Sequence, residues 1–121
     1  MKILVTEDDV FTQKIIEKTL NQKNYNVVIA SVAKEAIEKL SNEKFDVILV
    51  DIHMPGQDGI SLIRHIREQL NDNTPIGIVT RDKNENIVKR AFEVGADDFI
   101  IKPFDKDDLI KRVEKLCAKN R

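Results

Sequence analysis

The chain has 121 residues, which is enough for one domain with a single hydrophobic core, and we expect residues 1–121 to form one domain. Charged residues make up 34% of the chain but cancel to a net charge of −1, which excludes nucleic-acid binding through bulk positive charge. No apolar run reaches the roughly 18 residues of a membrane span, and the start does not resemble a signal peptide. The chain has a single cysteine, Cys117, which cannot form an intramolecular disulfide. These features favour a cytoplasmic protein without a membrane segment.

Five short apolar runs, rich in β-branched residues, are predicted to be strands. Each run is bounded by polar or turn-forming residues, and such runs are typical of strands that are buried on both faces of a parallel sheet. The predicted strands cover residues 2–5, 25–30, 46–50, 75–79 and 98–101.

The segments between these runs carry apolar residues at helical spacing and charged residues on the opposite side, which predicts amphipathic helices. Their apolar faces begin at Phe11, Ala33, Ile60, Ile87 and Leu109, and we expect these faces to pack on the sheet. Five strand–helix alternations with short links predict right-handed crossovers and helices on both faces. The predicted fold class is therefore α/β, with a doubly wound, five-stranded parallel sheet of the (βα)5 type.

Polar side chains follow four of the five predicted strands. Glu7, Asp8 and Asp9 follow the first strand, and Asp51 follows the third. A hydroxyl group at position 80 follows the fourth strand, and an amine at position 102 follows the fifth. Ligands of open parallel sheets bind beyond the carboxyl ends of the strands. We therefore expect these side chains to meet at one edge of the sheet.

Such a cluster restricts the chemistry of the site. Two like charges about 4 Å apart repel by roughly 4 kcal/mol at an effective dielectric constant near 20, so the carboxylates require a cation or a proton. Oxygen ligands favour a hard ion such as Mg²⁺, or Mn²⁺ in its place. A metal ion, the ammonium of Lys102 and the hydroxyl of Thr80 would together hold a phosphoryl group. Asp51 is then the candidate nucleophile.

Four segments, in this order and at these strand ends, resemble the two-component response-regulator receiver domain. The segments are ILVTEDD, DVILVDIHMPGQDG, PIGIVT and GADDFIIKPF, and the resemblance covers nearly the whole chain. The resemblance implies a flavodoxin-like sheet with the strand order 2-1-3-4-5, as in the chemotaxis regulators of the family.

The resemblance also implies roles for individual residues. Asp51 would accept a phosphoryl group from a phosphohistidine of a sensor histidine kinase or a histidine phosphotransfer protein. Mg²⁺ would be held by Glu7, Asp8, Asp51 and the backbone carbonyl of His53. Lys102 would contact a phosphoryl oxygen, its bond to the following proline would be cis, and Asp9 would cap the first helix. Such a domain is a phosphoacceptor that assists its own phosphorylation and dephosphorylation, and is no enzyme acting on other substrates.

The implied switch consists of Thr80, which would move onto the phosphoryl group, and Phe99, which would turn inward behind it. This movement would change the surface of the fourth helix, fifth strand and fifth helix, and so control an output domain or a partner. His53, Arg81 and Asp82 occupy positions that tune the phosphate lifetime in the family. Arg81 departs from the small residue usual there, and is expected either to shade the site or to pair with the phosphate.

Two other site chemistries conflict with the same residues. A haloacid-type phosphatase needs a second aspartate two residues after the nucleophile, where this chain has His53. A flavin-binding protein of similar sheet order needs a hydroxyl- and glycine-rich loop after the first strand, where this chain has three acids. A degenerate receiver that acts as a phosphate-independent interaction module remains the alternative.

Partner surfaces are expected in two places. A phosphorylation-dependent homodimer would use the fourth helix, fifth strand and fifth helix, where Arg112 with Asp97 or Asp98, and Arg90 with Glu93, resemble pairs seen in DNA-binding regulators. A kinase or phosphotransfer protein would dock beside the first helix. The docking residues would be Val10, Phe11 and Lys14, although Phe11 is equally compatible with a place in the core.

Transcription control is one expected output of the domain, without direct nucleic-acid contact by the domain itself. The chain is either a standalone regulator or part of a longer one.

Overall fold

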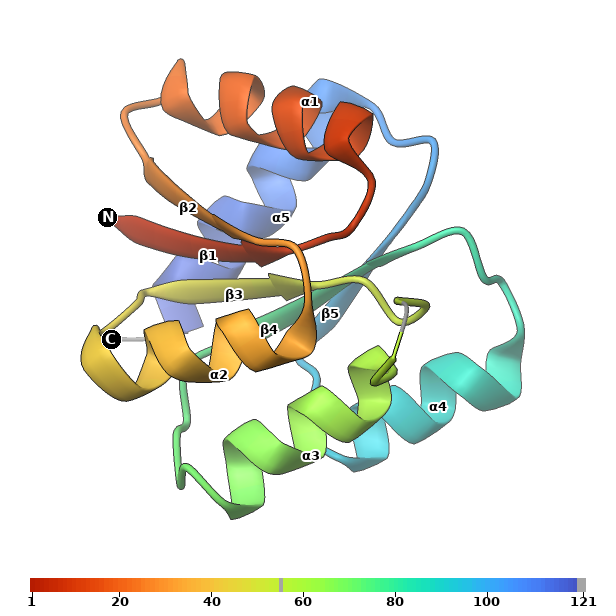
Figure 1. The fold of residues 1–121 in the computed structure, drawn as a ribbon. Helices are drawn as coiled ribbons and strands as arrows, with labels where there is room; N and C mark the ends of the chain where they lie inside the picture. Colours follow the sequence, from red (N-terminus) through yellow and green to blue (C-terminus); the bar gives the residue numbers. More distant parts are fainter. Residues whose placement is uncertain (55, 120–121) are drawn as a thin grey trace.

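The computed structural model describes residues 1–54 and 56–119; Pro55 of the predicted acceptor loop and the last two residues of the predicted domain lie outside this description. Within these residues, five strands and five helices alternate (Figure 1). They are β1 (Lys2–Thr6), α1 (Val10–Asn21), β2 (Asn26–Ala30), α2 (Ala33–Asn42), β3 (Val47–Val50), α3 (Gly59–Glu68), β4 (Ile76–Thr80), α4 (Glu85–Glu93), β5 (Asp98–Ile101) and α5 (Lys106–Lys119).

The strands form one sheet in the order β2-β1-β3-β4-β5, and every pair of neighbours is parallel. All four residues of β3 are buried at the centre of this sheet. The predicted fold class and strand order are therefore confirmed. The reversal of strand order falls between β1 and β3, which is the place where ligands of such sheets bind.

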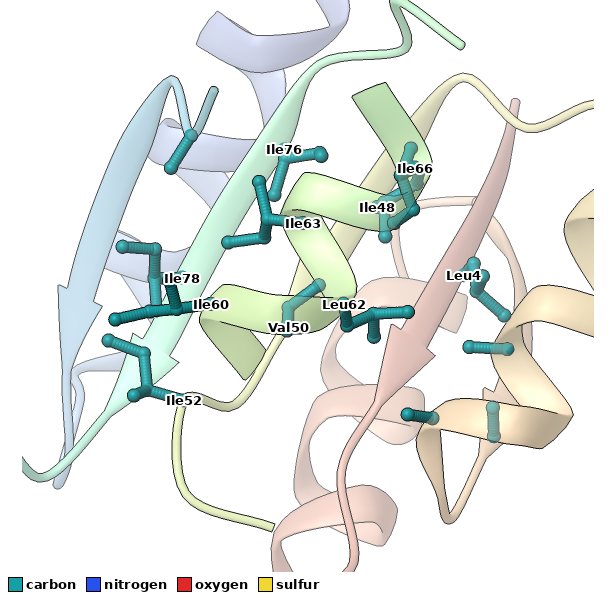
Figure 2. Packing of buried hydrophobic residues seen from close by; sticks show 14 of the residues in the cluster. Leu4, Ile48, Val50, Ile52, Ile60, Leu62, Ile63, Ile66, Ile76 and Ile78 are labelled. Atoms are coloured by element: carbon teal, nitrogen blue, oxygen red, sulfur yellow. The ribbon is translucent and has the colours of Figure 1, made fainter. Parts of the chain in front are cut away.

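Alternate residues of each strand face different helices, because successive side chains of a strand point to opposite faces. Leu4, Ile48 and Ile78 pack with α2, α3 and α4 in one cluster, and Figure 2 shows α3 lying across these strands. Val5 and Leu49 pack with α1 and α5 in a second cluster on the other face. The sheet is thus covered on both faces, which explains why its strands are apolar runs without polar alternation.

Side-chain caps begin several helices, directly after a strand or loop. The Asp9 carboxylate accepts from the backbone N–H of Thr12 at 3.1 Å and caps α1, as predicted. Asp58 caps α3 and Asn84 caps α4 in the same way. Such caps satisfy backbone donors that have no partner within the helix. They fix where each helix starts relative to the carboxyl edge of the sheet.

Phe11 does not face the core, and the prediction that its helix buries a face beginning at this residue is wrong. Its side chain is 72% exposed. The buried face of α1 is instead formed by Thr12, Ile16, Thr19 and Leu20. Because each residue turns the helix by about 100°, a face centred on these positions leaves Phe11 beside it, in solvent.

A network around Arg67 fastens the amino edge of β4 and β5. The guanidinium of Arg67 donates to the Gly95 carbonyl at 2.8 Å, to the Asp72 carbonyl at 2.8 Å and to the Thr74 carbonyl at 2.7 Å. It also pairs with the Asp97 carboxylate at 3.1 Å. One side chain thereby joins the loops that precede β4 and β5. No helix within the described residues is long and apolar enough to cross a membrane.

Candidate phosphoacceptor site

The alternation of the strands explains which polar side chains meet at the carboxyl edge. Glu7, Asp51 and Lys102 each take the next position in a row of side chains that faces α1 and α5. The preceding members of these rows are Ile3 and Val5 in β1, Val47 and Leu49 in β3, and Ile100 in β5. Because these three rows lie on the same face, the three polar groups extend it beyond the strand ends.

Lys102 bridges the two buried carboxylates. Its Nζ lies 2.5 Å from Glu7 Oε1 and 3.2 Å from Asp51 Oδ2. The side chains of Lys102, Glu7 and Asp51 are only 9%, 2% and 8% exposed. A buried ammonium between two buried carboxylates supplies one compensating charge for two. The structure therefore brings together the predicted acceptor, one predicted metal ligand and the predicted lysine.

The acidic residues also fit a divalent cation. Glu7, Asp8 and Asp51 each offer a carboxylate oxygen, and these atoms lie within 4.8 Å of one another. Asp8 is exposed, so the ligand set opens toward solvent. Burial raises the pKa of the Glu7 carboxyl to about 7; the charge of Asp51 adds to the rise, and the hydrogen bond from Lys102 opposes it. A hard cation bound by these oxygens would favour the ionised form of Glu7.

The backbone around Asp51 is fixed on both sides. Its N–H donates to the Thr6 carbonyl at 3.0 Å, and the His53 N–H donates to Asp51 Oδ1 at 3.2 Å. The Gly59 N–H donates to the Ile52 carbonyl at 2.7 Å. A Cβ atom at position 59 would lie 2.4 Å from the Asp51 carbonyl oxygen, so only glycine allows α3 to begin this close to the acceptor.

Thr80 lies at the end of β4, one strand away from Asp51, and is fully buried. It continues the row of Ile76 and Ile78, which faces α3 and α4. Its Oγ1 accepts from the Asp82 N–H at 3.0 Å, and its carbonyl accepts from the Lys102 N–H at 2.8 Å. The predicted cis peptide bond between Lys102 and Pro103 is present.

The three predicted rate-tuning residues lie around the site. Arg81 is exposed and lines the same open pocket as the acidic residues and Lys102. His53 Nε2 lies 2.7 Å from Asp82 Oδ2, and this hydrogen bond holds the pKa of the Asp82 carboxyl below its usual value. The direct contact between His53 and Asp82 was not predicted. The sequence does contain a signal for this contact, because His53 lies two positions after Asp51 and Asp82 lies two positions after Thr80.

Phe99 is half-buried between α4 and α5. Its ring meets the ring of Phe92 edge-on, with centroids 6.1 Å apart, and the guanidinium of Arg112 lies 5.8 Å from its centroid. Of the alternative partners predicted for Arg112, Asp98 forms the pair, at 2.7 Å. Asp97 pairs with Arg67 and Lys119 instead.

Arg90 and Glu93, also expected at a homodimer surface, form no ion pair with each other within the described part of a single chain, so their role between two chains stays a prediction.

Known proteins match the chain along nearly its whole length. The family model described as the response regulator receiver domain matches residues 3–114. The transcriptional regulatory protein ResD of Bacillus subtilis is 38% identical over 118 residues, which cover 98% of this chain and 48% of ResD. The transcriptional regulatory protein CrdR of Helicobacter pylori is 33% identical over 114 residues, which cover 94% of this chain and 54% of CrdR. The chain thus spans about half the length of these curated relatives.

Solved structures resemble the whole fold. The receiver domain of a Francisella response regulator has a TM-score of 0.92 at 33% identity, covering 99% of this chain and 98% of that chain. A two-component response regulator from Clostridium difficile has a TM-score of 0.93 at 27% identity, covering 98% of this chain and 97% of that chain.

Proposed function

The chain belongs to the response regulator receiver family, and from this membership we propose that Asp51 accepts a phosphoryl group from a phosphohistidine of a sensor histidine kinase or a histidine phosphotransfer protein. An Asp51 carboxylate oxygen attacks the phosphorus atom. A P–O bond forms, the P–N bond breaks, and the departing imidazole nitrogen keeps the electron pair of that bond. Residues 1–121 act in this proposal as one receiver domain.

The observation that carries the proposal is that Asp51 lies beside the ammonium of Lys102 and in one group with the acids Glu7 and Asp8. The 3.2 Å distance from Lys102 Nζ to Asp51 Oδ2 puts a positive charge where negative charge would accumulate during transfer. Glu7, Asp8, Asp51 and the His53 carbonyl would hold Mg²⁺. When bound, this ion supplies charge neutralisation for the phosphoryl oxygens.

We further propose that the phosphoryl group changes the surface formed by α4, β5 and α5. Thr80 would move toward the phosphoryl group, and Phe99 would follow from its half-buried position. An apolar groove next to Phe99, lined also by Val88 and Ile101, would change with it. This surface would control an output domain or a partner, including a second copy of the chain. The relatives described as transcriptional regulatory proteins suggest an output in transcription.

The phosphodonor is proposed to dock at the start of α1. Val10 and Phe11 are 58% and 72% exposed. An open pocket beside them is lined by Phe11, Lys102 and Phe104, and so connects this apolar surface to the acceptor site. Such a surface suits an amphipathic helix of the partner. Phe11→Ala is expected to slow transfer from the partner severalfold, without slowing labelling by a small phosphodonor.

A degenerate receiver that acts without phosphate is the second candidate. The full set of Glu7, Asp8, Asp51, Thr80 and Lys102 argues against it, because a module that only binds partners has no need of buried charges beside an open acidic pocket.

Labelling with acetyl phosphate, read by intact mass, tests the proposal. Wild type with Mg²⁺ is expected to gain one phosphoryl group, whereas Asp51→Asn, or wild type with a chelator, gains none. Labelling of Asp51→Asn at the wild-type rate would reject Asp51 as the acceptor. Absence of labelling in wild type, together with no response to beryllofluoride, would favour the degenerate receiver.

A further inference from the structure

A contact between the side chains of His53 and Asp82 joins the two loops that flank the acceptor site. His53 lies between β3 and α3, and Asp82 lies between β4 and α4. His53 Nε2 donates to Asp82 Oδ2 at 2.7 Å. The imidazole is 62% exposed and Asp82 is 23% exposed, so the contact lies near the surface and neither side chain is fixed by burial alone. Its position is therefore sensitive to movement of either loop.

Asp82 makes two further hydrogen bonds in the segment between β4 and α4, and a third hydrogen bond continues from Asn84. Its N–H donates to Thr80 Oγ1 at 3.0 Å. Its Oδ1 accepts from the Asn84 N–H at 2.8 Å. The Asn84 side chain in turn caps α4 by accepting from the Asn86 N–H at 2.9 Å. Asp82 thus connects the buried hydroxyl of Thr80, through its backbone N–H, to the first turn of α4, through its carboxylate.

His53 connects the same contact to the acceptor. Its backbone N–H donates to Asp51 Oδ1 at 3.2 Å, while its imidazole reaches Asp82. A series of hydrogen bonds therefore runs from the Asp51 carboxylate through His53 and Asp82 to the cap of α4. Thr80 belongs to this series, because its hydroxyl can leave its present place only by giving up the hydrogen bond from the Asp82 N–H.

We propose that the hydrogen bond between His53 and Asp82 is a latch that holds Thr80 and the first turn of α4 in the resting arrangement, and that the latch opens when Asp51 is phosphorylated. The opening of the latch on phosphorylation rests on the proposed function. A contact made only in the resting state lowers the population of the active state. Removal of the latch therefore favours the active arrangement without any new contact to the phosphoryl group.

Hydrogen exchange of the unphosphorylated protein tests the latch independently of phosphate chemistry. His53→Ala is expected to speed exchange of the Asn84 and Asn86 amides about two- to tenfold, the range that one hydrogen bond supplies. In a chain that already carries Asp82→Ala, His53→Ala is expected to have no further effect, because the contact is already lost. Gln57→Ala, an exposed change in the loop of His53, serves as the control.

Titration with beryllofluoride and Mg²⁺, followed by NMR, tests the effect on activation. His53→Ala is expected to bind beryllofluoride about two- to tenfold more tightly than wild type, whereas His53→Gln, which keeps a donor, stays near wild type. Tighter binding that disappears in the Asp82→Ala background supports the latch. Binding that is unchanged or weaker in His53→Ala, or an effect of the same size in both backgrounds, overturns it. If wild type binds no beryllofluoride, the proposed function fails, and hydrogen exchange alone decides the latch.

Discussion

Two charged clusters lie at opposite edges of the sheet and differ in how completely the protein pairs them. At the amino edge, the guanidinium of Arg67 meets one carboxylate, Asp97, and the carbonyls of Asp72, Thr74 and Gly95. The guanidinium of Arg67 has five N–H donors in a planar arrangement. The acceptors occupy donors on its Nε, Nη1 and Nη2 atoms. Charge and hydrogen-bonding capacity are therefore matched within the chain.

At the carboxyl edge, the acidic residues exceed their cation. Glu7, Asp8 and Asp51 face one ammonium, that of Lys102. The raised pKa of Glu7 is the direct consequence of placing this carboxyl in a buried site with too little positive charge. The comparison teaches that a fully paired charge cluster serves the fold, whereas a cluster left short of positive charge has capacity for a cation and for the anion that the cation attracts.

Removal of the ammonium should show the largest effect at the carboxyl edge. Lys102→Met is expected to lower the rate of labelling by acetyl phosphate about 10²- to 10³-fold at saturating Mg²⁺, because one preorganised positive group beside the acceptor is lost. Intact-mass kinetics measure this rate, and circular dichroism verifies the fold. Lys106→Met, on the exposed first residue of α5, should label at the wild-type rate. A rate within threefold of wild type for Lys102→Met would show that the two clusters do not differ in function.

Removal of the cation at the amino edge should affect stability and leave chemistry intact. Arg67→Met removes the guanidinium donors of Asp97 and of three carbonyls, and is expected to lower the free energy of unfolding by about 3 kcal/mol. Urea denaturation followed by circular dichroism measures the loss, since the chain has no tryptophan. Arg64→Met, on the exposed face of the same helix, is the matched control. Slower labelling of folded Arg67→Met protein would contradict the separation of the two clusters.

Proton competition at Glu7 should make Mg²⁺ binding depend on pH. With a pKa of about 7, this carboxyl is mostly protonated at pH 6 and mostly ionised at pH 8. Because Mg²⁺ needs the ionised form, its affinity is expected to be about tenfold weaker at pH 6 than at pH 8. Calorimetric titration of the unphosphorylated protein measures both affinities. Glu7→Gln should bind more weakly and lose most of the pH dependence, and equal wild-type affinities would refute the role of Glu7.

The outer contact of the Arg67 network should show the smallest effect. Lys119 lies 3.4 Å from the Asp97 carboxylate, but its side chain is 53% exposed. Lys119→Ala is expected to change the free energy of unfolding by less than about 0.5 kcal/mol, because water already solvates this charge. A loss as large as that of Arg67→Met, measured by the same urea denaturation, would show that exposed and buried partners of Asp97 contribute equally.

The fold was largely predictable because local patterns determine it. The β-branched runs gave all five strands within a residue or two, and the alternation of strands and helices gave the parallel sheet. The strand order came from resemblance, since apolar runs alone do not say which strands are neighbours. The pattern left Phe11 open between the core and an exposed docking surface, because a helical repeat at the edge of an apolar face resembles one at its centre, and the structure exposes it.

The part of the site formed by residues at strand ends was predictable from the sequence. Glu7, Asp51 and Lys102 meet because parallel strands place their carboxyl ends together. The contact between His53 and Asp82, and the network of Arg67, were not found. Each depends on how loops lie relative to one another and on long side chains that have several rotamers, and neither property follows a repeat in the sequence.

Gly59 has a consequence for how the domain can move. Because any side chain at this position would overlap the main chain of Asp51, helix α3 abuts the acceptor with no spare volume between them. A rearrangement that pushed this helix further toward the sheet would meet a steric barrier at once. Under the proposed function, we therefore expect displacement set off at the acceptor to be absorbed on the opposite flank, where β4 leads into α4 through polar residues.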